Sequence, residues 1–211
     1  EKGVAEYDIK YPVAWDKIEL SKASIEKVKK ADAFIFGSLV CRDSISRETL
    51  LSLLEYAKFK VFDVNLRSGF FDASLIEKLM KSSDLIKLND DELSILSNRF
   101  GSKSDDLYEN IKFIHKKLQL KSICVTRAEK GAILFIDNVF YSNNGIIVDV
   151  VDSVGAGDSF LSALIYKLLS QNDHQNTLNF ACAVGTLVAT KTGANSKISA
   201  NEIRTIIKQF N

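Results

Sequence analysis

Hydrophobic and polar positions follow two different periods along this chain. Short apolar runs bounded by polar residues predict buried strands, and longer stretches with an apolar residue every three or four positions predict amphipathic helices. We predict strands at residues 33–37, 60–64, 84–88, 122–126, 132–137, 139–142 and 146–150. We predict helices at residues 44–58, 71–81, 105–118, 156–170, 174–190 and 199–209, and a short helix that opens at Asn89.

This order of elements predicts the fold class. Strands that alternate with helices need crossover connections, so the sheet is expected to be mostly parallel and covered by helices on both faces. No internal repeat, charge block or linker follows Trp15. We therefore expect one compact α/β domain over residues 14–211.

The opening segment, residues 4–13, alternates strictly between apolar and polar side chains. Tyr7 and Ile9 fall on one face, and Glu6 and Asp8 fall on the other. This pattern predicts a strand that is too short to fold alone. We expect residues 1–13 to be the remnant of a small sheet, and the natural protein to begin further upstream.

Composition narrows the class of function. The chain has 211 residues, of which 46% are apolar and 26% charged, and its formal net charge is +1. A net charge this small does not create the strong positive potential that would attract nucleic acid or an anionic membrane. The apolar runs are too short to span a bilayer. Cys41, Cys124 and Cys182 form an odd, widely spaced set without a disulfide or zinc pattern, so we expect a cytoplasmic protein and three core cysteines.

The strongest candidate for chemistry is the stretch VDSVGAGDSF, at residues 151–160. The backbone N–H groups of Gly155, Ala156 and Gly157 would open a helix and form a cradle for an anion. Asp158, in the first turn, would either accept a proton or only complement the helix dipole. Phe160 stands where a dinucleotide fingerprint needs its third glycine, which argues against a nicotinamide dehydrogenase, and the chain has no Walker-type phosphate loop.

Polar residues also follow two earlier strands. Arg67 could clamp phosphate groups, or residues 63–67 could be a surface turn held by Asp63 and Asn65. Asn89 and Glu92 have the spacing of a capping box at a helix start.

The stretch VDSVGAGDSF resembles the signature D-T-x-G-A-G-D-x-F of the ribokinase-like (PfkB) carbohydrate kinases. The resemblance implies a three-layer α/β/α fold with a mostly parallel sheet, and it makes residues 1–13 part of a small β lid. It implies that Asp158 is the catalytic base and that Gly155, Ala156 and Gly157 form an anion hole. It also implies that Asp152 and Ser153 help bind a monovalent cation.

Other motifs carry the resemblance further. The run Asp63-x-Asn65-x-Arg67 is similar to that of the fructokinase and 2-keto-3-deoxygluconate kinase subgroup, in which the Asn and Arg face the phosphates and the reacting hydroxyl. The Asn89-x-x-Glu92 motif implies support of the nucleotide and its magnesium–phosphate network. Thr126 and Gly131 are further residues implied on the nucleotide side, and Gly193 and Asn195 are implied as neighbours of the nucleotide or of the cation.

The chain departs from the family pattern in two places. Ala128 replaces the middle glycine of T-x-G-x-x-G. If that position needs a positive φ, alanine costs about 1 kcal/mol or more there. The glycine-rich sugar motif and further lid strands expected before residue 4 are also not visible, so we expect a fragment of a longer protein that dimerises through its lid.

We therefore expect ATP-dependent phosphorylation of a small-molecule sugar, with Mg²⁺ and possibly K⁺, and without nucleic acid or membrane partners. Fructose is the first candidate; the alternatives are 2-keto-3-deoxygluconate, ribose, or a non-catalytic sugar- or nucleotide-binding protein on the same fold. We expect His115 and His174 to be solvated. For Trp15 we weigh plain packing against stacking on a sugar.

Overall fold

A computed structural model describes residues 9–67, 72–171 and 173–210 of the chain. It confirms the α/β class and the mostly parallel sheet. The chain forms two compact units, Ile9–Val125 and Thr126–Asn211. The predicted boundary after residue 13 stays a prediction.

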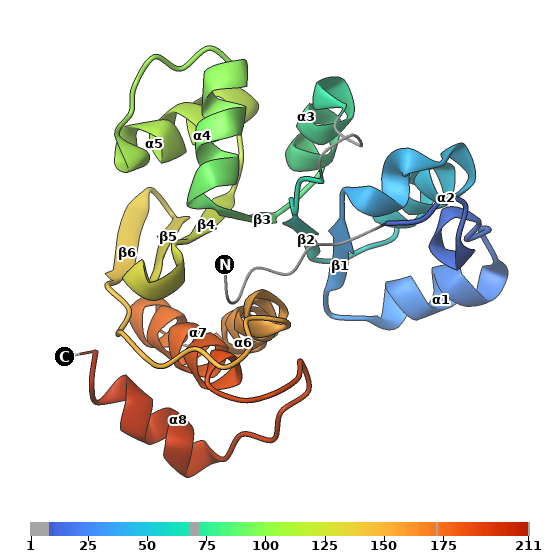
Figure 1. The fold of residues 1–211 in the computed structure, drawn as a ribbon. Helices are drawn as coiled ribbons and strands as arrows, with labels where there is room; N and C mark the ends of the chain where they lie inside the picture. The colour runs from blue at the N-terminus through green and yellow to red at the C-terminus, as the bar shows by residue number, and fades with distance from the viewer. Residues whose placement is uncertain (1–8, 68–71, 172, 211) are drawn as a thin grey trace. The chain divides into compact units, whose positions relative to one another are not determined.

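The first unit alternates strands and helices, as predicted (Figure 1). Its strands are β1 (Phe34–Gly37), β2 (Lys60–Asp63), β3 (Leu85–Asn89) and β4 (Ser122–Thr126), the last of which ends at the boundary of the unit. Its helices are α1 (Lys22–Lys30), α2 (Ser44–Leu54), α3 (Ala73–Lys81), α4 (Asp90–Arg99) and α5 (Leu107–Leu118), with short 3-10 turns η1 (Ala14–Asp16) and η2 (Leu39–Arg42).

The parallel pairing in this unit gathers the polar ends of the strands. Gly37 of β1 lies opposite Asp63 of β2, and Asp63 lies opposite Lys87 of β3. The apolar positions between these polar ends are fully buried, as Phe62 and Ile86 illustrate. The carboxyl ends of β1, β2 and β3 therefore share one edge, where a parallel sheet places its ligand sites.

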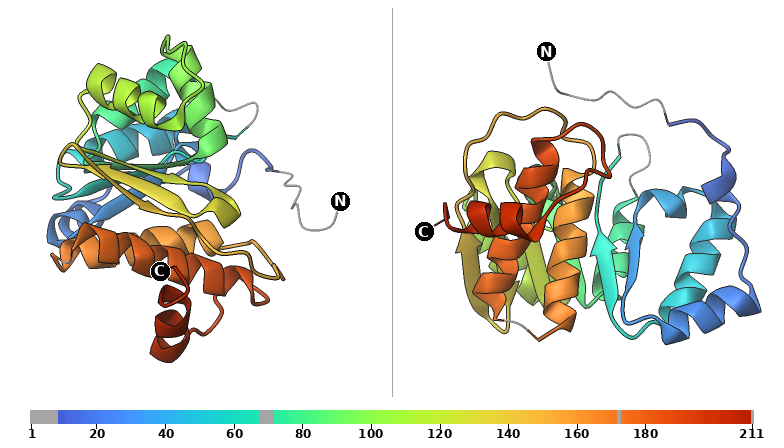
Figure 2. Two further views of the ribbon diagram at one scale, coloured as in Figure 1. Left: turned by 90° about the vertical axis from the view of Figure 1, so that its left-hand side faces the viewer. Right: turned by 90° about the horizontal axis from the view of Figure 1, so that it is seen from below.

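The second unit contains a hairpin and three helices. A short 3-10 turn η3 (Ala128–Lys130) precedes β5 (Ala132–Ile136), which pairs antiparallel with β6 (Val139–Asn143). Asp137 and Asn138 turn the hairpin with φ of +52° and +61°, the left-handed geometry that tight hairpins favour. Helix α7 (His174–Ala189) packs against both strands and against α6 (Ala156–Leu169) and α8 (Ala200–Ile207) (Figure 2).

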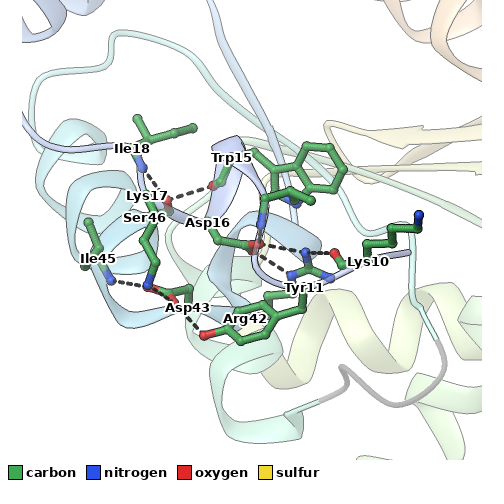
Figure 3. A network of polar contacts seen from close by, with 11 residues as sticks. Lys10, Tyr11, Trp15, Asp16, Lys17, Ile18, Arg42, Asp43, Ile45 and Ser46 are labelled. Carbon is green, nitrogen blue, oxygen red and sulfur yellow. Dashed lines mark hydrogen bonds and ion pairs between the residues drawn. The ribbon is translucent and has the colours of Figure 1, made fainter. Parts of the chain in front are cut away.

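Two predicted strands are wrong, and one helix was not predicted. Residues 146–150 form no strand, and Ile147 is 91% exposed, so this apolar run finds no sheet to cover it. Residues 9–13 form no strand either. There the Arg42 guanidinium donates to the Lys10 carbonyl and the Tyr11 hydroxyl donates to Asp43 (Figure 3). Residues 4–8 lie outside the described part. The sequence analysis also missed α1, whose signal is the Ser21 cap that accepts from the Ser24 N–H.

Other expectations are confirmed. Cys41, Cys124 and Cys182 are buried and form no disulfide. In the ranges that the structure describes, we find no helix with the length and apolar character needed to cross a membrane.

The backbone at Ala128 yields a stability prediction. Ala128 is exposed and has a φ of +49°, so the conditional expectation of a strained alanine is met. We expect Ala128→Gly to stabilise the protein by about 0.5–1 kcal/mol in urea unfolding, because glycine relieves left-handed strain larger than the entropy it adds. Ala200→Gly, at an exposed helical position, is the control and should destabilise. Equal changes in both variants would contradict this account.

Candidate active site

The sequence-predicted residues fall into two groups, one in each unit. Asp63, Asn65, Arg67, Asn89 and Glu92 belong to the first unit. The second unit holds Asp152, Ser153, Gly155, Ala156, Gly157, Asp158, Gly131, Gly193, Asn195 and Thr126, at its start.

Glu92 organises the first group. Its Oε1 accepts a hydrogen bond from the Leu66 N–H at 2.7 Å, and its Oε2 accepts one from the Asn89 N–H at 2.9 Å. Asn89 Oδ1 accepts from the Glu92 N–H at 2.8 Å, which completes the predicted capping box. Burial raises the pKa of Glu92 against the opposing effect of these two backbone donors. One buried carboxylate therefore ties the loop after β2 to the start of α4.

Asp63 has a partner that the sequence analysis missed. Lys87 Nζ lies 3.0 Å from Asp63 Oδ1, and both side chains are largely buried. The register that places Asp63 opposite Lys87 explains the pair. The signal was a lysine inside the apolar strand DLIKL, which needs a counter-charge when it is buried.

The loop after β2 presents Asn65 and Arg67. Asn65 has a φ of +45°, a left-handed conformation that asparagine tolerates better than most residues, and its carbonyl accepts from Ser38 Oγ at 3.2 Å. Arg67 is half-buried. The phosphate-facing roles of both residues stay predictions.

The Glu92 contacts yield a test of this group. Glu92→Gln keeps one oxygen and places an NH₂ against a backbone N–H, so we expect a loss of about 1–3 kcal/mol in urea unfolding. Glu77→Gln is the matched control: Glu77 pairs with Lys81 on the exposed face of α3, and its loss should stay below about 0.5 kcal/mol. Similar losses in the two variants would show that the hydrogen bonds of Glu92 do not stabilise the loop after β2 and the start of α4.

The second group is built around Gly155, the N-cap of α6. Its φ is +80°, and a Cβ there would lie only 2.6 Å from the Cβ and 2.8 Å from the Cα of Ala194. The loop at Ala194 therefore lies directly against the start of the helix. Sequence reasoning missed this contact, because no local pattern pairs residues so far apart.

Asp152 forms a hydrogen bond with the loop that contains Gly193 and Ala194. Its Oδ1 accepts from the Val154 N–H at 2.9 Å and its Oδ2 accepts from the Gly193 N–H at 3.1 Å. Asp152, a candidate for the cation site, and Gly193, a candidate for the nucleotide side, are thus brought together. Each carboxylate oxygen keeps a further lone pair, so a monovalent cation fits this carboxylate chemically.

An open cavity of about 430 Å³ extends along α6, from its N-cap Gly155 to Tyr166, and reaches Phe180 and Val184 of α7. Asp158 and Asn195 supply polar groups, and Tyr166 and Phe180 contribute an aromatic wall. The remaining lining residues are Gly155, Ser159, Ser162, Ala163, Val184 and Ala194. The first turn of α6 thus brings a carboxylate and the positive end of a 14-residue helix to one cavity.

The backbone donors of this turn are partly engaged. The Ala156 N–H donates to the Ser153 carbonyl at a long 3.3 Å. The first N–H groups of a helix have no partner inside the helix. The anion hole at Gly155, Ala156 and Gly157 stays a prediction.

The loop with Thr126 and Gly131 is held mainly by its own backbone. The Arg127 N–H donates to the Gly131 carbonyl at 2.8 Å, and a Cβ on Gly131 would lie 2.1 Å from the Asn143 carbonyl oxygen. Packing alone therefore requires glycine at 131, and the nucleotide contacts of this loop stay a prediction. Within the described ranges there is no cluster of three or more His, Cys, Asp or Glu side chains that could hold a metal ion.

Gly155 gives a second test of this unit. Gly193 has nearly the same φ, +83°, but a Cβ there would meet nothing within 4 Å. Gly193→Ala should cost about 1–2 kcal/mol of unfolding free energy from left-handed strain alone. Gly155→Ala should cost about 1–3 kcal/mol more, because its Cβ also overlaps Ala194. Equal losses would mean that the Ala194 contact constrains nothing.

The fold is that of sugar and nucleoside kinases. The chain is similar to a fructokinase from Xylella fastidiosa solved with bound ATP, with a TM-score of 0.74 and 24% identity over 87% of this chain and 63% of that one. It is also similar to an aminoimidazole riboside kinase from Salmonella enterica solved with aminoimidazole riboside and an ATP analogue (TM-score 0.70, 25% identity, 83% of this chain and 62% of that one).

Residues 10–201 match the pfkB family carbohydrate kinase model, and the chain belongs to that family. Fructokinase-2 of Solanum lycopersicum is 28% identical over 205 residues, which cover 89% of this chain and 61% of the relative. The chain thus spans about three fifths of the length of these relatives.

Proposed function

We propose that the protein to which this chain belongs transfers a phosphoryl group from ATP to a hydroxyl of a sugar, with fructose as the first candidate. The observation that carries the proposal is the position of Asp158, in the first turn of α6 and on the wall of an open cavity. Family membership and a similarity to fructokinases support it.

The carboxylate of Asp158 would accept the proton of the attacking hydroxyl. A carboxylate beside the anion-binding start of a helix repels a bound phosphate. Asp158 at this position is therefore explained best by a role in the reaction. Proton abstraction from a positioned hydroxyl is such a role.

The start of α6 would supply the electrostatic part of catalysis. ATP supplies the phosphoryl group, whose negative charge spreads during transfer. N–H groups at residues 155–157 and the helix dipole would stabilise that charge. In the first unit, the Arg67 guanidinium would bind phosphate oxygens.

The expected cations fit this scheme in different ways. Mg²⁺ is usually held by substrate phosphates and only one or two carboxylates, so it needs no cage of protein ligands. Glu92, with a backbone donor on each oxygen, would position the loop of Asn65 and Arg67 beside such a complex. Asp152 and Ser153 are the candidates for a K⁺ site.

Fructose is preferred because of the relatives. Fructokinase-2 of Solanum lycopersicum is among the similar proteins. An Arabidopsis thaliana ribokinase and a Thermotoga maritima 2-dehydro-3-deoxygluconokinase are also similar, so ribose and 2-keto-3-deoxygluconate remain the alternative substrates. We further propose the reducing cytoplasm as the compartment, in keeping with three cysteines that form no disulfide. We also propose a dimer through the opening segment.

The test is ADP release from Mg-ATP with fructose, ribose and 2-keto-3-deoxygluconate, using the protein with its natural termini. We expect release that depends on fructose, and a fall of about 10²–10⁴-fold in Asp158→Asn, the range that general-base catalysis contributes. Asp149→Asn, at an exposed carboxylate shortly before the motif, is the control and should keep its activity.

Two outcomes would contradict the proposal. A folded protein that binds a sugar or ATP tightly but releases no ADP with any sugar would be a binding protein on this fold. Near-normal turnover in Asp158→Asn would remove that residue from the chemistry.

A further inference from the structure

A polar network in the second unit joins the loop of residues 126–131 to the end of β6. Arg127 Nη2 donates to the Lys130 carbonyl at 2.6 Å and, over a longer 3.4 Å, to the Asn143 carbonyl. The Arg127 guanidinium is therefore directed at the backbone of its own loop and of β6. An arginine engaged in this way holds main chain in place.

Stability alone gives little reason for an arginine at this position. The Nε atom of Arg127 is buried, and it has no hydrogen-bond partner among the residues that the structure describes. A buried donor without a partner costs about as much free energy as a hydrogen bond from a charged group contributes. A role of Arg127 in the shape of the loop explains the residue better.

Asn143, the last residue of β6, connects the same loop to α7. It is 4% exposed, and both polar atoms of its side chain have partners. Its Oδ1 accepts from the Gly145 N–H at 2.8 Å, and its Nδ2 donates to Asn179 Oδ1 at 2.8 Å. Asn179 Oδ1 also accepts from Gln175 Nε2 at 3.0 Å. The end of β6 is thus fixed to the first turns of α7, the helix that packs against it (Figure 2).

Two glycines bring the backbones of the two segments into direct contact. Gly131 and Gly145 both have a positive φ, of +76° and +68°. A Cβ on Gly131 would lie 2.4 Å from the Gly145 nitrogen, and a Cβ on Gly145 would lie 2.6 Å from the Gly131 nitrogen. The loop of residues 126–131 therefore cannot shift independently of residues 143–145.

The strained Ala128 lies in this loop. Backbone hydrogen bonds close a tight turn around it: the Arg127 N–H donates to the Gly131 carbonyl at 2.8 Å, and the Gly131 N–H donates to the Ala128 carbonyl at 3.1 Å. A residue other than glycine keeps a left-handed backbone where its surroundings determine it. The loop therefore has its shape before any ligand arrives, which lowers the entropy cost of binding.

We propose that Arg127 and Asn143 are positioning residues for ATP. They hold residues 126–131 in the shape that binds the nucleotide, and neither of them touches it. That this loop faces the nucleotide rests on the proposed function. If both residues only stabilised the fold, their replacement would not change ATP binding in a variant that stays folded.

The first test is the KM for ATP at saturating fructose, measured on the protein with its natural termini. Arg127→Met removes the hydrogen bonds and keeps an unbranched side chain. We expect its KM for ATP to rise roughly five- to tenfold, with kcat and the KM for fructose within about twofold of the parent. Its urea midpoint should stay close to that of the parent, because the buried Nε is removed as well.

Two further arginine variants calibrate this result. Arg127→Lys keeps the charge and one donor group, so its KM for ATP should lie between those of the parent and Arg127→Met. Arg204→Met is the matched control, since Arg204 is exposed on α8 and its Nε also donates to a backbone carbonyl, that of Ala200, at 3.2 Å. Its KM for ATP should not move.

Asn143→Asp tests the other end of the network. The aspartate keeps an acceptor for the Gly145 N–H but places a carboxylate oxygen against Asn179 Oδ1, so we expect the KM for ATP to rise. Circular dichroism checks that the variant is folded under the assay conditions. Asn201→Asp, at an exposed position of α8, is the control and should keep the parental KM.

A second substitution at Ala128 should restore part of the loss. Glycine adopts a left-handed backbone without strain, so a loop without the Arg127 contacts should keep its shape more readily with glycine at 128. Arg127→Met combined with Ala128→Gly should therefore have a lower KM for ATP than Arg127→Met alone. A purely structural role of Arg127 predicts no such recovery.

The two proposals fail in different ways, and the Kd of ATP, measured by calorimetry without a sugar, distinguishes them. A higher Kd in Arg127→Met and Asn143→Asp, in a protein that releases no ADP, would overturn the kinase and support the positioning role. Turnover of fructose with an unchanged KM and Kd for ATP in both variants would overturn the positioning role. Equal rises in the KM for ATP and for fructose would overturn it too, because they indicate a general loss of structure. A parent protein that does not bind ATP would overturn both proposals.

Discussion

The close approach of Gly155 to Ala194 is the constraint on which the candidate catalytic centre depends. It fixes where α6 begins, because only a residue without Cβ and with left-handed backbone fits there. Once that start is fixed, Asp158 falls in the first turn and Asn195 lies on the same cavity. Asp152 holds the loop from the other side through the Gly193 N–H. Close packing against Ala194 alone therefore requires glycine at this position.

In the other unit, Glu92 has the comparable role. A carboxylate that is costly to bury is kept because two backbone N–H groups bind it, one from each of two consecutive strand-end segments. The ends of β1, β2 and β3 share an edge through their parallel register. In each unit, polar side chains are thus held by hydrogen bonds to the backbone.

The elements could be predicted wherever burial and periodicity agree. The apolar run SICVT became β4 with the predicted bounds, and the Asn89 capping box starts α4. Residues 146–150 show the limit, because an apolar run does not reveal whether a neighbouring strand exists to pair with it. Helix α1 was missed because Val28 is its only buried residue, which leaves almost no hydrophobic stripe to read.

The candidate site divides in the same way. Residues that follow strands, such as Asn65 and Asp158, could be named from the sequence because the fold class determines where strands end. Contacts between distant segments could not: Lys87 with Asp63, Arg42 with Asp16, and Gly155 with Ala194 join residues that no local period relates. Ala128 is an intermediate case. The family motif suggested that this position could need a positive φ, and the structure shows a φ of +49° there.

The most direct test of the central claim separates binding from chemistry at Asp158. Single-turnover phosphoryl transfer should be measured by rapid quench, with ATP and fructose each saturating, alongside the Kd of each ligand. The account predicts that Asp158→Asn keeps both Kd values within about twofold and transfers the phosphoryl group about 10²–10⁴-fold more slowly. Transfer at the parental rate from the saturated variant would contradict it.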